Sequence, residues 1–478
     1  MKKLFVFALA LLAVVACNDT SEVEEVVITT LEGSSFSLSE FGAHTFPATD
    51  SWVITDDSAT TDDFEGLSAA IEYISASDSE RSIALEFTAL TAIPSYAIYG
   101  TALSDASRSF TALGALEAPY AVSVGAYAFD SCSSLSSIYM PLAESVDKYA
   151  FNGCTSLQSL EMEYATSIGA SAFNNCNSMQ TIDLPLVESL GEQAFRLCSS
   201  VEELSFPELI KMGAGALSYC TALTSLDAPQ LISLGDYALC EAVLLTTIST
   251  PLLEEIGSYA FIACASLESY TITESVATIG NGIFNSCDNI TQITMEDNDL
   301  YLFEDGMLYD AAQSELILAL QSVISGDIVF PTTLVTIRDR ALYNCYQVTS
   351  IEVPAVEIIP YGAFAFCEAL ITATFDIATT FEAQALFDCQ ILETLSAPYL
   401  TTLESKSLYN CDSITDLSIA TAPGVALDYI DVQAFYGAYI DYTILTLSAA
   451  NADYVSYGDT LTVGEFTAEF YDIDVLEE

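Results

Sequence analysis

The chain has very little positive charge. Its 478 residues include 67 Asp and Glu against 10 Lys and Arg, which gives a formal net charge of −57. Nucleic-acid binding requires Lys and Arg to neutralise phosphates, so this composition argues against a nucleic-acid partner. It disfavours anionic membrane surfaces for the same reason. Cationic partners, bridging divalent cations and simple solubility are the interpretations that this charge leaves open.

Histidine is almost absent, because His44 is the one histidine in the sequence. Sites that need two histidine ligands are therefore excluded, and a Ser-His-Asp triad is disfavoured. A glycoside hydrolase would need a pair of carboxylates, and no pair stands out among the 67 acidic residues. We predict that the protein is not an enzyme and has no catalytic residues.

After residue 17, the chain has no apolar run long enough to span a bilayer. Residues 1–17 begin with Lys2 and Lys3 and continue with the apolar stretch Leu4 to Val15, which is typical of a signal peptide. The last four residues, Val14 to Cys17, resemble the bacterial lipobox, whose cysteine is lipidated and becomes the new N-terminus. We predict lipidation at Cys17; an ordinary signal peptide cleaved nearby is the alternative.

The acidic segment that follows Cys17, beginning Asn18-Asp19, resembles the export tag of Bacteroidetes surface lipoproteins. This resemblance implies a protein anchored by lipid in the outer membrane and exposed on the cell surface, with retention in the periplasm as the alternative. The lipid would be the protein's only contact with the membrane.

A 22-residue unit recurs through most of the chain, and its clearest copy is Ser167 to Pro185. Counted from Cys176 as position 0, apolar residues stand at +3, +6, +8 and +14, often with Pro at +9. Gly stands at +15, Ala-Phe at +18 and +19, and the next Cys at +22. This period is typical of leucine-rich-repeat solenoids. We predict an α/β solenoid, a right-handed superhelix with a ladder of parallel strands and short helical turns.

Each repeat position suggests a local structure. Positions +6 to +8 should form a short strand, with +6 and +8 facing the core and +7 facing outward. Pro at +9 lacks the N–H that the ladder needs and should end the strand. Ala, Phe, Cys and Leu recur at helical intervals from +18 to +25, which predicts a helical turn. Gly at +15 would provide a tight bend between strand and helical turn.

Cysteines recur once per repeat, as at Cys132, Cys154 and Cys176. No close Cys pairs or zinc-type His clusters accompany them. The same slot accepts Phe110 and Ala242, so it selects an apolar group rather than a thiol. We predict buried structural cysteines and no metal site; disulfides between neighbouring repeats are the less favoured alternative.

The repeat pattern also divides the chain. Residues 18–35 form an acidic tether, and residues 36–82 should form an N-terminal cap or small domain with a helix over 64–74. Repeats fill residues 83–427, with a β-hairpin variant repeat at about 297–322. Residues 428–478 should form a C-terminal cap that covers the open end of the solenoid.

The stretches SLSSIYMP, SIGASAFNNC and EIGSYAFIAC resemble the BspA-like leucine-rich repeat of Bacteroidetes-type surface lipoproteins. Within the interruption, Glu-Asp-Gly-Met-Leu-Tyr resembles the variant repeat of that family. The similarity covers roughly residues 83–440. It implies the usual roles of the family, which are attachment to host extracellular proteins or to other bacteria.

The candidate binding residues stand at positions +5 and +7, on the outward side of the predicted strands. They are Ser137, Tyr139, Ser159, Glu161, Thr181, Asp183, Glu203, Ser225, Asp227, Thr247 and Glu352. Together they would make a hydroxyl-rich acidic face that could bind basic protein segments, hydrogen-bond sugars or hold Ca²⁺. Stacked aromatics are lacking, which weakens the sugar hypothesis, and Ser and Thr are also tolerated on any solvated strand.

We therefore predict a cell-surface lipoprotein that acts as a non-catalytic binding or adhesion protein through its repeat surface. Its partner would be a protein on a host or neighbouring cell. A surface glycan-capture protein of a polysaccharide uptake system, using cap aromatics such as Trp52, Tyr439 and Tyr442, is one alternative. An envelope structural scaffold is the other. No cofactor is expected, although Ca²⁺ is left open.

Overall fold

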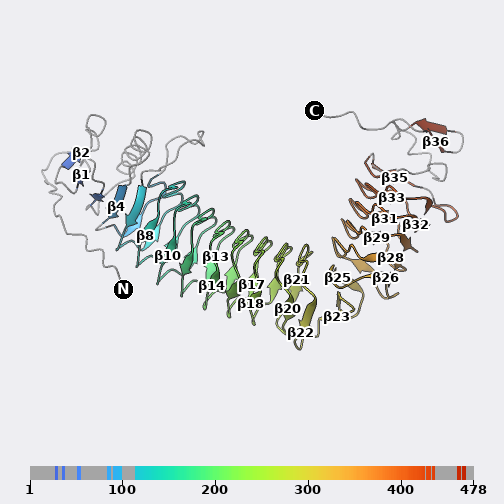
Figure 1. Cartoon of the computed structure of the whole chain (residues 1–478), viewed down its shortest axis with the longest axis horizontal. Coiled ribbons are helices and arrows are strands. Elements are labelled where there is room, and N and C mark those ends of the chain that lie inside the picture. Colours follow the sequence, from blue (N-terminus) through green and yellow to red (C-terminus); the bar gives the residue numbers. More distant parts are fainter. Residues whose placement is uncertain are drawn as a thin grey trace. The chain divides into compact units, whose positions relative to one another are not determined.

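The structure is a computed structural model that describes residues 27–30, 35–37, 51–54, 83–87, 90–98, 113–425, 427–431, 433–436, 460–463 and 466–469. It divides into two compact units, Met1–Leu253 (unit 1) and Glu254–Glu478 (unit 2). Within each unit the chain coils as a solenoid whose successive repeats stack their strands side by side (Figure 1). The helix expected over 64–74, and most of both expected caps, lie outside the described residues.

Unit 1 contains two ladders of parallel strands, in which each strand pairs with strands of adjacent repeats. The first ladder comprises β3 (Ser51–Ile54), β4 (Ile83–Phe87), β6 (Leu113–Glu117), β8 (Ser137–Tyr139), β10 (Ser159–Glu161), β12 (Thr181–Asp183), β14 (Glu203–Ser205), β16 (Ser225–Asp227) and β18 (Thr247–Ser249). The second ladder comprises β5 (Ala92–Ile93), β7 (Ser123–Val124), β9 (Ser145–Val146), β11 (Ser167–Ile168), β13 (Ser189–Leu190), β15 (Lys211–Met212) and β17 (Ser233–Leu234). Strands β1 (Val27–Thr30) and β2 (Ser35–Ser37) pair antiparallel.

Unit 2 repeats the two-ladder pattern on both sides of an interruption. Before it lie β19 (Glu255–Ile256), β20 (Ser269–Ile272), β21 (Thr278–Ile279) and β22 (Gln292–Met295). After it, one ladder comprises β26 (Gly326–Val329), β28 (Val348–Val353), β30 (Thr372–Phe375), β32 (Thr394–Ala397) and β34 (Asp416–Ile419). The other comprises β29 (Ile358–Ile359), β31 (Thr380–Phe381), β33 (Thr402–Leu403) and β35 (Tyr429–Ile430), and β36 (Thr460–Val463) pairs antiparallel with β37 (Phe466–Glu469).

The interruption is an antiparallel excursion from the parallel ladders. It consists of β23 (Tyr301–Glu304), β24 (Met307–Asp310) and β25 (Glu315–Ala319), and β25 then pairs in parallel with β27 (Thr336–Ile337). Asp305 and Gly306 form the two-residue turn between β23 and β24, with φ angles of 51° and 80°. Positive φ at both central residues is the geometry of a type I′ turn, whose twist matches that of the flanking strands.

The predicted helical turns are wrong, because the described residues contain no helix. Each repeat carries two residues with positive φ, four positions apart, such as Ser171 (53°) and Asn175 (61°). A right-handed helix cannot contain left-handed residues at that spacing. Instead, the N–H groups of Phe173 and Asn175 donate to carbonyls of the next repeat at 2.8 and 2.7 Å. The architecture is therefore a parallel β-solenoid with turns, and not an α/β fold.

The core lies between the two ladders of each unit, as the strand periodicity predicts. Leu160 and Met162 are buried while Glu161 between them is exposed, and Ile168 on the second ladder is also buried. Each core position lies directly above its equivalent in the previous repeat, so identical side chains stack. The phenylalanines at +19 form such a stack, with ring centroids about 5 Å apart; these are Phe129, Phe151, Phe173 and Phe195.

The repeat cysteines are buried and free, which confirms their structural role for the described residues. The thiol of Cys176 donates to the carbonyl of Phe151 at 3.3 Å, and the thiol of Cys198 donates to the carbonyl of Phe173 at 3.4 Å. Ala242 is fully buried in the same slot, while Cys240, which falls outside the 22-residue spacing, is partly exposed. The slot thus requires an apolar group and not a disulfide.

The glycines at +15 serve close packing rather than the tight bend that the sequence suggested. At Gly125, Gly169, Gly191, Gly213 and Gly235, the φ angle lies outside the left-handed region. A Cβ built on Gly191 would instead lie 2.5 Å from the amide nitrogen of Ala170 in the preceding repeat. Glycine therefore allows the backbones of adjacent repeats to approach each other.

We expect Gly191→Ala to lower the free energy of unfolding by about 1–3 kcal/mol, because the methyl group must displace backbone atoms of the neighbouring repeat. Denaturant unfolding monitored by circular dichroism would measure this change. The exposed neighbour Glu192 supplies the control, since Glu192→Ala should stay within about 0.5 kcal/mol of the parent chain. Equal stability of the two variants would contradict the close approach at Gly191.

Candidate functional site

The predicted binding residues of unit 1 all lie on the first ladder, on strands β8 to β18. Those on the outward side at +7 are well exposed, and Tyr139 retains 56% of its accessible surface. The parallel register places Glu161 directly opposite Asp183, and Glu203 opposite Ser225. We call the set Ser137, Tyr139, Ser159, Glu161, Thr181, Asp183, Glu203, Ser225, Asp227 and Thr247 the acidic face. The remaining predicted residue, Glu352, lies exposed on β28 of unit 2.

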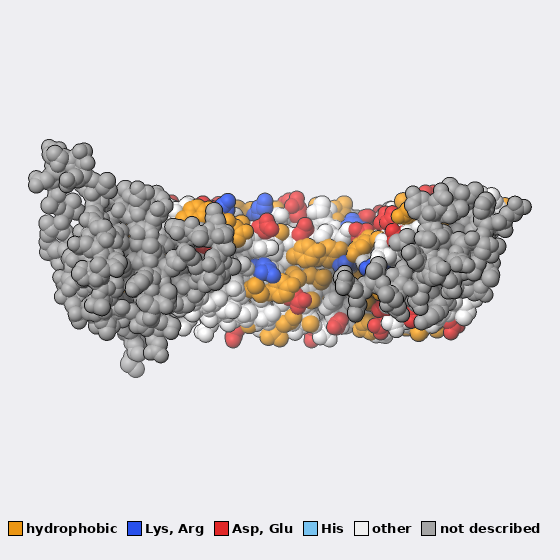
Figure 2. Space-filling view, turned by 90° about the horizontal axis from the view of Figure 1, so that it is seen from above, with side chains coloured by type: hydrophobic (Ala, Val, Ile, Leu, Met, Phe, Trp, Pro, Cys, Tyr) orange, Lys and Arg blue, Asp and Glu red, His pale blue; other side chains and the backbone are white. Residues whose placement is uncertain are grey.

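The acidic face contains no basic residue. The described Lys and Arg of unit 1 are Lys148, Arg196 and Lys211, which stand at repeat positions +16, +20 and +13, on the second-ladder side of each repeat. Figure 2 shows Lys and Arg side chains on one face of the molecule, among patches of hydrophobic side chains. None of these three basic residues stands on a first-ladder strand, whereas exposed carboxylates occur on both sides of the repeat, such as Glu161 on the first-ladder side and Asp147 on the second-ladder side.

Directly opposed like charges are unfavourable between paired strands. Glu161 and Asp183 form such a pair, since adjacent strands lie about 4.8 Å apart. A cationic group placed against this face would relieve that repulsion. Among the described residues, no group of three or more His, Cys, Asp or Glu side chains is arranged to hold a metal ion.

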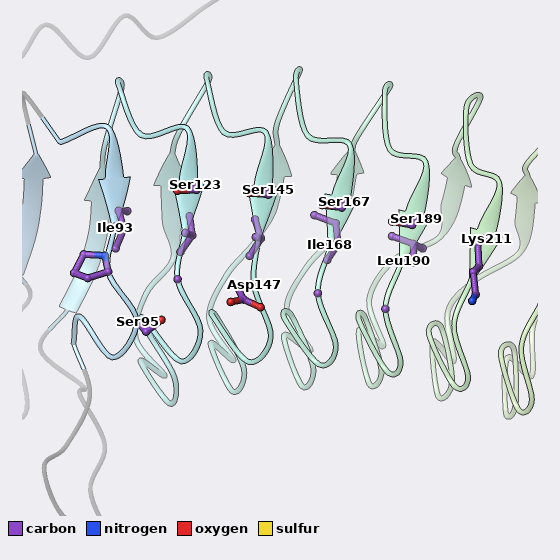
Figure 3. Close-up of a pocket in the computed structure, with 16 residues that line it drawn as sticks. Ile93, Ser95, Ser123, Ser145, Asp147, Ser167, Ile168, Ser189, Leu190 and Lys211 are labelled. Atoms are coloured by element: carbon purple, nitrogen blue, oxygen red, sulfur yellow. The ribbon is translucent and has the colours of Figure 1, made fainter.

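A groove that the sequence pattern did not predict runs along the second ladder of unit 1 (Figure 3). It has a volume of about 690 Å³ and crosses β5, β7, β9, β11, β13 and β15. A row of serine hydroxyls lines it, and Asp147 and Lys211 are its charged residues; the serines are Ser123, Ser145, Ser167 and Ser189. The recurrence of Ser at +13 was the available signal. Gly125, Gly169 and Gly191 also line the groove, and Asp147 stands at the same repeat position.

Two arginines of unit 2 were also missed, and both bridge the interruption. Arg338 pairs with Glu315 at 2.9 Å and donates to the carbonyl of Ile279, which lies before the excursion. The guanidinium of Arg340 lies 5.1–5.5 Å from the ring centroids of three tyrosines, namely Tyr259, Tyr343 and Tyr361. Cation–π contacts and the ion pair hold the flanking repeats together, so this cluster is structural.

The sequence profile of the BspA type Leucine rich repeat region matches the chain in 6 copies, over residues 122–242, 210–324 and 321–441. The chain belongs to this family. Among solved structures, this BspA-type protein is similar to a leucine rich cell surface protein from Faecalibacterium prausnitzii. The TM-score is 0.50 at 20% identity, with 63% of this chain and 84% of the other covered, which supports the solenoid fold.

A leucine-rich repeat protein from Bacteroides ovatus is also similar, with a TM-score of 0.42 and 18% identity over 67% of this chain and 84% of the other. No curated protein matches the chain. Within the described part of this BspA-type protein, no helix has the length and apolar character that crossing a bilayer requires.

Proposed function

We propose that this BspA-type protein is a cell-surface lipoprotein, anchored through Cys17, that binds a protein partner on a host or neighbouring cell through its acidic face. Solenoid repeats provide long regular binding surfaces, and membership in this family supports a non-catalytic binding role. The observation that carries the proposal is the in-register pairing of exposed carboxylates, Glu161 with Asp183, on a ladder without basic residues. Such a surface is complementary to a basic protein segment.

The first test is a binding screen of the unlipidated chain from Asn18 onward against extracellular-matrix proteins and polysaccharides, with Ca²⁺ and with chelator. We expect saturable binding to a protein that has a basic surface. This binding should weaken as salt is raised, because exposed charges are screened. Ca²⁺ dependence would instead indicate that carboxylates of the face share a bound cation.

Charge reversal should locate the site within the chain. We expect Glu161→Lys, Asp183→Lys and Asp227→Lys together to weaken binding at least tenfold, because attraction at three positions becomes repulsion. The matched control reverses three exposed carboxylates on the second-ladder side, Asp147, Glu192 and Asp236, and should change affinity little.

Two results would contradict the proposal. Binding to a polysaccharide that is insensitive to the first set of reversals would place the site elsewhere and favour glycan capture. Failure to bind any of the extracellular-matrix proteins or polysaccharides, combined with regular self-association, would favour an envelope scaffold.

A further inference from the structure

In unit 1, the turn that connects the first ladder to the second carries a row of exposed apolar side chains. In four consecutive repeats the residue at +10 is large, apolar and exposed; these are Tyr120 (54% exposed), Leu142 (41%), Tyr164 (46%) and Leu186 (43%). In the next two repeats the exposed apolar residue moves to +12, at Ile210 (45%) and Ile232 (37%). We call these six residues the apolar corner.

The apolar corner is held in line by backbone hydrogen bonds between repeats. The N–H of Glu144 donates to the carbonyl of Val122 at 2.8 Å, and the N–H of Thr166 donates to the carbonyl of Glu144 at 2.9 Å. Turn bonds within each repeat, such as Ala143 N–H to the carbonyl of Met140 at 3.2 Å, fix the corner itself. The apolar side chains therefore project from a preorganised backbone at the repeat spacing of about 4.8 Å.

The fold does not require apolar residues at +10. In the two repeats that follow Leu186, this position holds Glu208 and Gln230, both exposed, while the adjacent +11 position holds the buried Leu209 and Leu231. The repeat thus tolerates polar groups at +10 and uses +11 for its core. Single exposed apolar residues are common on protein surfaces, but a contiguous row is typical of an interaction site.

Carboxylates flank the apolar corner on both sides. On the first-ladder side lie Glu161 and Asp183 at +7, and on the second-ladder side lie Glu144 and Glu188 at +12, all exposed. Positions +7 to +12 of these repeats contain no Lys or Arg. An apolar row between two acidic margins is complementary to a segment that has an apolar stripe and basic flanks.

We propose that the apolar corner of unit 1 docks a basic amphipathic helix of a protein partner. One helical turn advances 5.4 Å, close to the repeat spacing of about 4.8 Å, so anchors at i, i+3 or i+4, and i+7 meet successive repeats. The span from Tyr120 to Leu186 is three repeat steps, about 14 Å, which a helix of about ten residues covers. This inference rests on the proposed function and specifies the chemistry of the partner.

The test uses two fluorescent peptides and the chain from Asn18 onward. One peptide is an 18-residue Leu/Lys helix with Leu at i, i+3, i+4 and i+7, and the other is a scrambled isomer of identical composition. We expect the amphipathic peptide to bind at least tenfold more tightly than the scrambled one. Leu142→Gln with Leu186→Gln should abolish that preference, and folding should be retained because Gln230 occupies the same position in the parent chain. The control Leu244→Gln alters a residue that is 49% exposed away from the corner and should preserve the preference.

The outcomes separate this inference from the proposed function. Equal binding of both peptides, lost on charge reversal of Glu161, Asp183 and Asp227 but unchanged by the corner variants, would overturn the inference and leave the proposed function intact. Peptide binding that responds to neither set of variants would contradict both. A dimer that dissociates in the Leu142 and Leu186 variants would assign the corner to a second copy of the chain and would also overturn the inference.

Discussion

Replacing Phe173 by Ala is expected to lower the free energy of unfolding of the surrounding repeats by about 3–5 kcal/mol. Its side chain is fully buried, and its ring stacks between those of Phe151 and Phe195, at centroid distances of 5.2 and 5.3 Å. The site has little freedom to collapse, because ladder hydrogen bonds fix the backbone of each repeat to its neighbours. The cavity would therefore persist, and both adjacent rings would lose contacts.

The effect should be local, since each repeat of a solenoid contacts only its neighbours. Hydrogen exchange of the amides in β10, β12 and β14, together with denaturant unfolding, would measure it. Phe173→Leu is the matched control, because Leu217 and Leu239 occupy the equivalent position in later repeats and are fully buried there. We expect Phe173→Leu to lower the free energy of unfolding by about 1–2 kcal/mol. Unchanged unfolding of the Ala variant would show that Phe173 does not pack in the core.

Alkylation of the native chain from Asn18 onward should label Cys240 far faster than the buried repeat cysteines, which recur at the 22-residue spacing. The thiols of the repeat cysteines are fully buried, and a reagent can reach them only after local opening of the repeats. Burial also raises the pKa of these thiols, for example to about 12 for Cys220, which suppresses the reactive thiolate. If opening costs about 4 kcal/mol, labelling slows about a thousandfold. Mass spectrometry of the labelled peptides would resolve each site.

The pH dependence at Cys240 provides an independent check. Burial, assisted by the charge of Glu241 and opposed by that of Arg196, raises its pKa to about 11. Because the thiolate is the nucleophile, its labelling rate should rise about tenfold per pH unit from pH 8 to 10 and level off near pH 11. In the denatured chain the rate should level off at lower pH. Rapid labelling of most repeat cysteines in the native chain would mean that these cysteines face solvent and are not part of the core.

The repeat, its strand register and its core could all be predicted from the amino-acid sequence. Each core position recurs in many repeats, so the pattern of apolar residues around Cys176 could be checked against the other repeats of the same chain. Cys176 and Ala242 occupy the same repeat position, which already indicated that the position does not require a thiol. Both residues are buried in the structure. The outward direction of Glu161 also followed from the period of two along a strand.

The choice between helix and turn, in contrast, depends on contacts between repeats. Ala, Phe, Cys and Leu recur at intervals that suit a helix. The left-handed positions hold glycine in a few repeats, such as Gly153 and Gly215, but ordinary residues such as Gln193 and Leu197 in the others. The hydrogen bonds that hold these residues run to the next repeat, for example from the N–H of Leu197 to the carbonyl of Ser218 at 2.9 Å. A bond between segments 21 residues apart leaves no local signal in either segment.

The packing at Gly191 and the exposure of the apolar corner also depend on how the repeats stack. A Cβ on Gly191 would lie 2.5 Å from the amide nitrogen of Ala170, a constraint that lies in the preceding repeat and not in the turn itself. At the apolar corner, the sequence shows two adjacent apolar residues in Leu186 and Val187, and only the fold reveals that Val187 is buried while Leu186 faces solvent. The period of the sequence thus determined which residues align from repeat to repeat. Contacts between repeats decided which backbone conformation they adopt and which surfaces they expose.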